Sequence, residues 1–199
     1  IRHSSLPSQQ QEDAGVCRIS IIVPADGSQE ALDDTLISVL ENRPDDCQVV
    51  VSHSSGYQDP YDLGDEVDFV PCASADTAVL VNEALESSRA EVVHILAPGS
   101  LACPGWTDAA LAALIDHPDI DAVAPAILDP RNPRRLAAAG IRYGRGGRKC
   151  LVARGRRLRA DHTKTIQVDG PLLQAAFVRR KTLIHMGGLR SCFGHHHID

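Results

Sequence analysis

Short runs of buried-type apolar residues alternate with amphipathic stretches along the chain, and this alternation restricts the fold more than any other feature. The run Ile19–Val23 is apolar on both faces of the pleat, which is typical of a buried parallel strand. One helical face then gathers four apolar residues, Leu32, Leu36, Val39 and Leu40. Ser28 predicts the N-cap of this helix, and Arg43-Pro44 predicts its end.

The same alternation continues to residue 128. Further strands are predicted at 48–51, 68–70, 92–96 and 122–128, and further helices at 78–85 and 108–115, the last with Thr107 as its N-cap. Strands that alternate with helices imply an α/β fold with a mainly parallel sheet and helices on both faces. Ligands of such sheets bind at the carboxyl ends of the strands. We therefore expect a site in the loops after Val23, Val51 and Leu96.

The last third of the chain has a weaker pattern. Residues 142–159 contain seven Arg, one Lys and no acidic residue, and they predict either a β-hairpin around Gly144–Gly147 or a mobile loop. Ordered structure is expected again at residues 168–178, after the basic stretch. A helix at 180–186 follows, with Gly187 in the left-handed conformation as its stop.

Composition narrows the class of protein. A chain of 199 residues with 43% hydrophobic residues suits one domain, and a net charge of −6 argues against nucleic acid as the main partner. The six cysteines are widely spaced, which favours free thiols in a reducing cytoplasm. We expect residues 1–16 to form a flexible segment and residues 17–199 to form the domain. Because the sequence begins with Ile1, we also expect a fragment of a longer protein.

Five segments carry a resemblance to a known family: "ISIIVPADGSQEALDDTLISVL", "LAPGSLACPGW", "AVAPAILDP", "RLAAAGI" and "VDGPLLQAAFVRRKTLIHMGGL". Their order and spacing resemble those of family 2 glycosyltransferases. The resemblance implies the GT-A fold and a nucleotide-diphosphate sugar as donor. It also implies transfer to an acceptor hydroxyl of a glycan or lipid, with inversion.

Three positions depart from the family pattern. The loop after the second strand is 52–55, Ser-His-Ser-Ser, where the family has an Asp that contacts the base. The metal-binding D-x-D turn is replaced by Ala97-Pro98-Gly99, which argues against Mn²⁺ or Mg²⁺ at this turn. The family's E-D-x-D motif is matched by residues 196–199, His-His-Ile-Asp, with His197 in the place of the catalytic base.

Donor and acceptor contacts are expected at seven residues: Pro24, Asp26, His53, Ser54, Ala97, Gly99 and Asp169. Four of them have a structural alternative. Asp26 either accepts a hydrogen bond from the base or ribose, or is an acidic residue at a helix N-terminus. His53 and Ser54 either contact the base or form a polar turn, and Asp169 either approaches the acceptor sugar or belongs to a tight turn.

His197 has three readings: a general base, a metal ligand together with its neighbours, or part of a solvent-facing cluster. The basic stretch also has three: it replaces the metal at the diphosphate, it is a solvated loop, or it contacts anionic lipid headgroups. Two functions follow as hypotheses. The chain is a cytoplasmic, membrane-associated glycosyltransferase, or it is a catalytically inactive binding or regulatory module with the same fold.

Overall fold

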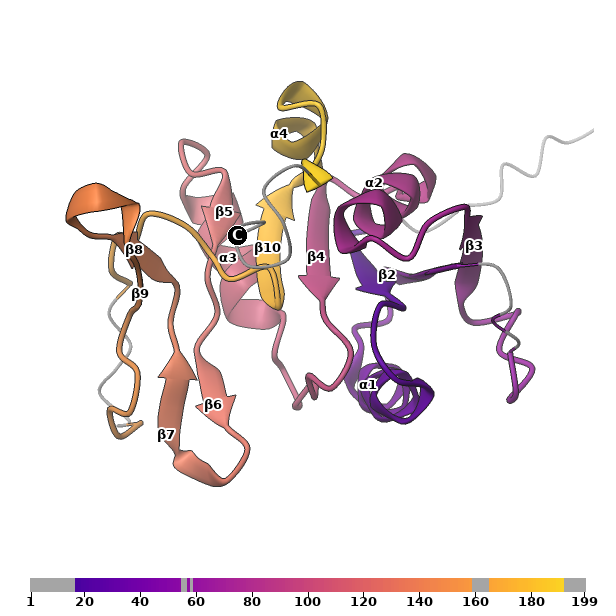
Figure 1. The fold of residues 1–199 in the computed structure, drawn as a ribbon, viewed down its shortest axis with the longest axis horizontal. Helices are drawn as coiled ribbons and strands as arrows, with labels where there is room; N and C mark the ends of the chain where they lie inside the picture. The colour runs from indigo at the N-terminus through magenta and orange to yellow at the C-terminus, as the bar shows by residue number, and fades with distance from the viewer. Residues whose placement is uncertain (1–16, 55–56, 58, 159–164, 192–199) are drawn as a thin grey trace, which may run out of the picture.

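The computed structural model describes residues 17–54, 57, 59–158 and 165–191 (Figure 1). The predicted flexible segment 1–16 and His197 therefore lie outside the described residues. A six-stranded sheet in the order β3-β2-β1-β4-β10-β5 forms the centre. Its strands are β1 (Ile19–Pro24), β2 (Cys47–Ser54), β3 (Asp68–Cys72), β4 (Val92–Leu96), β5 (Ala122–Val123) and β10 (Ala175–Arg179). The first four pair in parallel, whereas β10 runs antiparallel to both β4 and β5.

Four helices accompany the sheet within the described residues: α1 (Gln29–Asn42), α2 (Thr77–Ser87), α3 (Asp108–Asp116) and α4 (Arg180–His185). The predicted cap of α1 is confirmed, because the Ser28 hydroxyl accepts a hydrogen bond from the Ala31 N–H. Thr107 directly precedes α3, as predicted, but it makes no capping bond with its side chain. Its backbone angles are helical, whereas a capping side chain needs an extended backbone to reach back. Gly187 has a φ of +76°, as expected at the end of α4.

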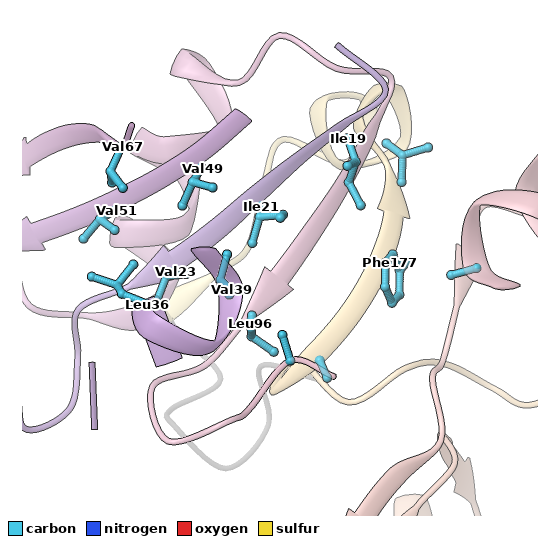
Figure 2. Packing of buried hydrophobic residues seen from close by; sticks show 14 of the residues in the cluster. Ile19, Ile21, Val23, Leu36, Val39, Val49, Val51, Val67, Leu96 and Phe177 are labelled. Carbon is cyan, nitrogen blue, oxygen red and sulfur yellow. The ribbon is translucent and has the colours of Figure 1, made fainter. Parts of the chain in front are cut away.

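The core consists of two apolar clusters, one on each face of the sheet. Every residue of β1 is buried, and alternate side chains enter opposite clusters. Ile21 packs in the cluster that contains Leu36 and Val39 of α1, shown in Figure 2, and Ile22 packs in the cluster that contains Val81 of α2. Apart from Ser20, the strand is apolar because it is covered on both sides, as the sequence predicted.

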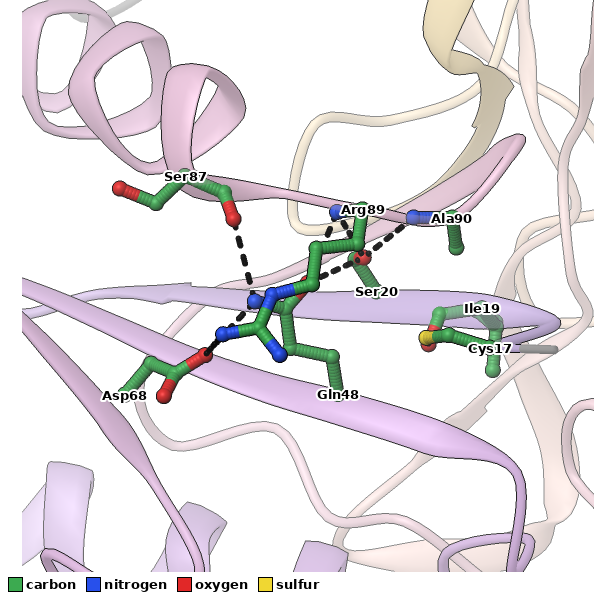
Figure 3. A network of polar contacts seen from close by, with 8 residues as sticks. All are labelled: Cys17, Ile19, Ser20, Gln48, Asp68, Ser87, Arg89 and Ala90. Atoms are coloured by element: carbon green, nitrogen blue, oxygen red, sulfur yellow. Dashed lines mark hydrogen bonds and ion pairs between the residues drawn. The ribbon is translucent and has the colours of Figure 1, made fainter. Parts of the chain in front are cut away.

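A network of polar contacts joins the amino ends of strands in the central sheet (Figure 3). The Ser20 hydroxyl donates to Gln48 Oε1 at 2.7 Å and accepts from the Ala90 N–H at 3.2 Å. The Gln48 amide nitrogen donates to Asp68 Oδ2 at 2.6 Å and to the Ser87 carbonyl at 3.1 Å. The buried Ser20 and Gln48 side chains are thus satisfied. The network lies at the end of the sheet opposite the carboxyl ends, so it stabilises the fold rather than lining the expected site.

The predicted strand 122–128 is wrong as a single element. It is divided between β5 in the central sheet and β6 (Ile127–Asp129), which pairs with β7 (Asn132–Ala138) in a second sheet. Pro125 lies between the two strands, and a proline donates no ladder hydrogen bond. The hairpin predicted around Gly144–Gly147 is confirmed: β8 (Ile141–Tyr143) and β9 (Lys149–Leu151) pair across a 3₁₀ turn, η1 (Arg145–Gly147). No helix among the described residues has the length and apolarity to cross a bilayer.

Candidate functional site

The carboxyl ends of β1, β2 and β4 lie at one edge of the sheet, because these strands are adjacent and parallel. Pro24 pairs with Ser52, and the Ala25 N–H donates to the Ser52 carbonyl at 2.8 Å. The turns after β1 and β4 also touch, since a Cβ on Gly27 would lie 3.2 Å from Pro98 Cβ. Six of the seven predicted donor and acceptor residues, all but Asp169, therefore belong to loops or strand ends at this carboxyl edge.

The turn after β4 is held by α1. Gly99 has a φ of +84°, and its N–H donates to the Ala31 carbonyl at 3.0 Å and to Thr35 Oγ1 at 2.9 Å. Three residues further on, the Ala102 N–H donates to Ser38 Oγ at 3.0 Å. The backbone N–H groups of Gly99 and Ala102 are thus used in hydrogen bonds inside the protein.

The residues at the turn after β4 do not fit a divalent cation. Ala97 and Gly99 have no side-chain oxygen, and Pro98 packs against the loop after β1. Mn²⁺ and Mg²⁺ in such sites are held by carboxylates. Across the described residues, no three or more His, Cys, Asp or Glu side chains are grouped so as to hold a metal ion.

Three rings gather near the carboxyl end of β2, where Phe69 of the neighbouring strand β3 lies beside it. The ring centroids of His53 and Tyr57 are 4.9 Å apart, those of Tyr57 and Phe69 are 5.5 Å apart, and His53 meets Phe69 edge-on at 6.3 Å. Partial burial raises the pKa of Tyr57, a shift that its hydrogen bond with Gln29 opposes. These ring contacts place His53 in an aromatic cluster, which the polar-turn reading did not anticipate. We call His53, Tyr57 and Phe69 the ring cluster.

Sequence reasoning missed Tyr57 and Phe69. Phe69 is brought beside the end of β2 only by strand pairing, in which Val51 lies opposite Phe69 and His53 lies opposite Pro71. An open depression of about 430 Å³ also has Phe69 in its lining, but Asp68 and Ser87 of the amino-end network line it too, so it lies away from the carboxyl edge. The signal for the cluster was therefore in the pairing of β2 with β3 and not in any local motif.

His53 also has a local partner. Its Nδ1 lies 3.1 Å from the Ser54 carbonyl oxygen, which favours the tautomer with the proton on Nδ1. In that tautomer Nε2 is an acceptor. One residue earlier in β2, the buried Ser52 Oγ has no hydrogen-bond partner within the described residues. By strand alternation Ser52 lies on the face of Val50, which packs against α2, and so opposite to the ring of His53.

Asp26 is exposed and accepts a hydrogen bond from the Thr77 hydroxyl. Thr77 is the first residue of α2, so the carboxylate lies at the N-terminus of that helix rather than of α1, which directly follows it in sequence. A negative charge is favourable at a helix N-terminus. The contact fixes one carboxylate oxygen of Asp26 at the carboxyl edge.

Asp169 lies elsewhere. Its Oδ2 accepts from the Tyr143 N–H at 2.7 Å, and its own N–H donates to the Ile141 carbonyl at 3.0 Å. Both bonds join it to β8, and no hydrogen bond of the described residues joins it to the carboxyl edge. This geometry is the tight-turn alternative, in which Asp169 anchors the hairpin.

No family profile matches the sequence, and no curated protein matches it. Solved structures do match the fold. A mannosyltransferase of Pyrobaculum calidifontis, PcManGT in complex with GDP-Man and Mn²⁺, aligns with a TM-score of 0.60 over 89% of this chain at 18% identity. GalNAc-T7 with UDP, GalNAc and Mn²⁺ aligns with a TM-score of 0.66 over 93% of this chain at 14% identity. The chain has the GT-A fold.

The predicted fold class is thereby confirmed. At these identities the likeness concerns the GT-A fold alone. The chain spans 49% of the length of the mannosyltransferase and 40% of that of GalNAc-T7. Both of those proteins were solved with a nucleotide or nucleotide sugar and Mn²⁺, whereas the turn after β4 in this chain lacks the carboxylates that such an ion prefers.

Proposed function

We propose that this chain is a glycosyltransferase domain of the family 2 type. In this proposal it binds a nucleotide-sugar donor at the carboxyl edge and transfers the sugar, with inversion, to a hydroxyl of a glycan or lipid. The observation that carries the proposal is the ring cluster at the carboxyl end of β2 in a GT-A sheet. Every nucleobase has a flat π-face, and stacking on a protein ring is worth about 1–3 kcal/mol per base.

Polar groups next to the ring cluster would orient the nucleoside. Asp26 is held by Thr77 at the end of β1 and would accept from a ribose hydroxyl or a base N–H. The Nε2 of His53 and the hydroxyl of Ser54 would supply further contacts. The donor would therefore lie across the ends of β1 and β2, with its sugar toward Ala97 and Gly99.

The basic stretch does not reach the turn after β4 through any hydrogen bond of the described residues. Figure 1 shows β8 and β9 beyond β5, on the opposite side of the sheet from β3. The hypothesis that these arginines replace a metal at the diphosphate gains no support from these contacts. It would need a movement of the hairpin toward β4.

His197 is the residue that we propose as general base, on the order of motifs in the sequence alone. A histidine with an ordinary pKa near 6.5 is suited to take a proton from an attacking hydroxyl at neutral pH. The base would act on the acceptor, so His197→Ala should abolish turnover while donor affinity is kept.

A second candidate function is an inactive module that binds a nucleotide sugar without transferring it. The observation in its favour is the turn after β4, where Gly99 is bound to α1 and Pro98 packs on the loop after β1. A fixed turn without a ligand for a cation is what a lost catalytic site would leave.

One set of measurements separates the two functions. Thermal unfolding is followed with UDP-, GDP- and dTDP-sugars, in EDTA and in Mn²⁺, because a ligand that binds the native state raises Tm. Release of nucleoside diphosphate is then measured for the wild type and His197→Ala. Stabilisation with turnover that His197→Ala abolishes supports the transferase. Stabilisation without turnover supports the inactive module, and no stabilisation by any donor contradicts both.

A further inference from the structure

One long antiparallel ribbon projects beside β5. β7 leads into β8, the chain turns at η1, and residues 149–158 return along the same path. The Val152 N–H donates to the Gly140 carbonyl at 2.9 Å, and the Leu158 N–H donates to the Arg134 carbonyl at 2.8 Å. We call residues 131–158 the arginine ribbon. Its edges are fixed by backbone hydrogen bonds, so its side chains are displayed on an ordered surface.

Charge is segregated onto the arginine ribbon. Residues 131–159 contain ten Arg, one Lys and no Asp or Glu, although acidic residues outnumber basic ones 26 to 20 in the whole chain. Nine of these arginines are exposed in the described part of the ribbon. The rest of the molecule is therefore strongly acidic. An anionic partner would be attracted to the ribbon and repelled by the remaining surface.

Within the part of the chain that the structure describes, no ion pair offsets the repulsion between these arginines. Arg135 and Arg157 lie directly opposite across the ribbon, a placement in which like charges are destabilising. The ion pairs of the described residues, Arg43–Glu66 and Arg89–Asp68, involve no ribbon arginine. Anionic groups from outside the chain would relieve this repulsion.

Exposed apolar side chains lie among the charges. Tyr143 and Leu158 keep 49% and 46% of their surface exposed. An exposed leucine contributes little to the binding of a soluble polyanion. A bilayer surface, in contrast, binds arginines through its anionic headgroups and takes up apolar side chains at the same level. We propose that the arginine ribbon docks the protein on a membrane surface rich in anionic phospholipid. This proposal does not depend on donor binding at the carboxyl edge.

Vesicle flotation tests the proposal with the full chain. Vesicles of phosphatidylcholine and phosphatidylglycerol are compared with vesicles of phosphatidylcholine alone. We expect binding to the anionic vesicles only. It should weaken as salt rises from about 0.1 M to about 1 M, because the Debye length falls from about 10 Å to about 3 Å.

The double variant Arg154→Glu/Arg156→Glu reverses two ribbon charges, and Arg18→Glu/Lys181→Glu makes the same change in net charge at exposed sites elsewhere. At roughly fivefold in affinity per basic residue near an anionic surface, the ribbon variant should bind at least about tenfold more weakly. The control variant should bind as the wild type does. Equal losses in both variants, or binding by neither wild type nor control, would overturn the proposal.

Leu158→Ser separates a membrane from a soluble polyanion. The backbone bond of Leu158 to Arg134 is unaffected by this change, and circular dichroism with thermal unfolding confirms the fold of each variant. Membrane docking predicts that Leu158→Ser weakens vesicle binding and leaves binding to soluble polyphosphate unchanged. Vesicle binding that is insensitive to Leu158→Ser, with equal affinity for polyphosphate, would assign the ribbon to a soluble polyanion and overturn the membrane proposal.

Discussion

The side-chain amide of Asn82 in α2 makes two hydrogen bonds to the chain after α4, one through its nitrogen and one through its oxygen. Its Nδ2 donates to the Leu189 carbonyl at 2.9 Å, and its Oδ1 accepts from the Leu189 N–H at 2.8 Å. Gly188 lies against this amide, and a Cβ on Gly188 would lie 2.8 Å from Asn82 Cγ. Only a residue without a side chain fits while the two hydrogen bonds are kept.

Gly188→Ala should therefore lower the free energy of unfolding by more than Gly187→Ala. Both glycines have positive φ, +78° and +76°, so both variants incur the strain of a left-handed backbone, about 1–2 kcal/mol. Gly187 has open space around it, whereas Gly188→Ala also forces the Asn82 amide to move, at a further cost of roughly 1–3 kcal/mol. Urea denaturation measures the difference. Equal losses would show that the Asn82 contact does not constrain this position.

His94 is a second residue whose role is set by its surroundings. It is fully buried in β4, with its ring centroid 3.8 Å from that of Phe177 and 4.7 Å from that of Trp106. Neither ring nitrogen has a hydrogen-bond partner within the described residues. Burial lowers the pKa of His94 to about 3, so the folded protein holds a neutral imidazole.

The lowered pKa of His94 predicts a pH dependence of stability. Between the ordinary pKa near 6.5 and the folded pKa near 3, the unfolded state binds a proton that the native state does not. The free energy of unfolding should thus fall as pH drops through this window, by up to about 1.4 kcal/mol per pH unit. In His94→Leu this contribution should vanish. Parallel pH profiles of unfolding for the wild type and His94→Leu would contradict it.

At the scale of single residues, only some of the contacts could be predicted from the sequence. The Ser28 cap could be read from a polar residue before an apolar helical stripe. The contacts of Asn82, His94 and Tyr57 could not, because each depends on residues that meet only after the sheet has formed.

Among the elements, α1 does more than cover the sheet. Three polar residues on one of its faces hold the segment after β4: Thr35, Ser38 and Asn42. Thr35 Oγ1 accepts from the Gly99 N–H, Ser38 Oγ accepts from the Ala102 N–H, and the Asn42 carbonyl accepts from Trp106 Nε1 at 3.2 Å. The helix therefore fixes the turn after β4.

Thr35→Val tests this fixation, since it keeps the shape of the buried side chain and removes the hydroxyl. The Gly99 N–H keeps its bond to Ala31, but the hydroxyl contact is lost, so we expect a loss of about 1–3 kcal/mol in the free energy of unfolding. Asp34→Ala, at the exposed neighbouring position, should change the stability by less than about 0.5 kcal/mol. A Thr35→Val variant that is as stable as the wild type in chemical denaturation would show that this contact does not fix the turn.

The elements that were predicted best from the sequence are strands that are buried along their whole length and whose apolar residues follow one period, such as β1 and β4. β7 was missed because its first four residues are polar or proline and exposed, so alternation begins only at Leu136. The division of 122–128 was missed because Pro125 interrupts a run that is otherwise apolar. Apolar periodicity reports burial, and edge strands outside the core show little of it.

Across the whole molecule, the alternation of strands and helices was enough to predict an α/β fold with a mainly parallel sheet, whereas the GT-A fold was predicted from the resemblance to family 2 glycosyltransferases. The site was predicted only as a location. The sequence indicated the loops after β1, β2 and β4, and the structure adds the rings of Tyr57 and Phe69 beside His53. The separation of charge was visible in the sequence, whereas its display on an ordered ribbon was not.

In the proposed function, the carboxyl edge binds the nucleoside of a sugar nucleotide without a metal at the turn after β4. Calorimetric titration of UDP-, GDP- and dTDP-sugars in EDTA measures this binding, with Tyr57→Ala and, as control, Tyr61→Ala at an exposed tyrosine nearby. We predict saturable binding of one donor, weakened about tenfold by Tyr57→Ala through lost stacking and unchanged in Tyr61→Ala. Absence of binding by every donor, or binding that Tyr57→Ala leaves intact, would contradict the account.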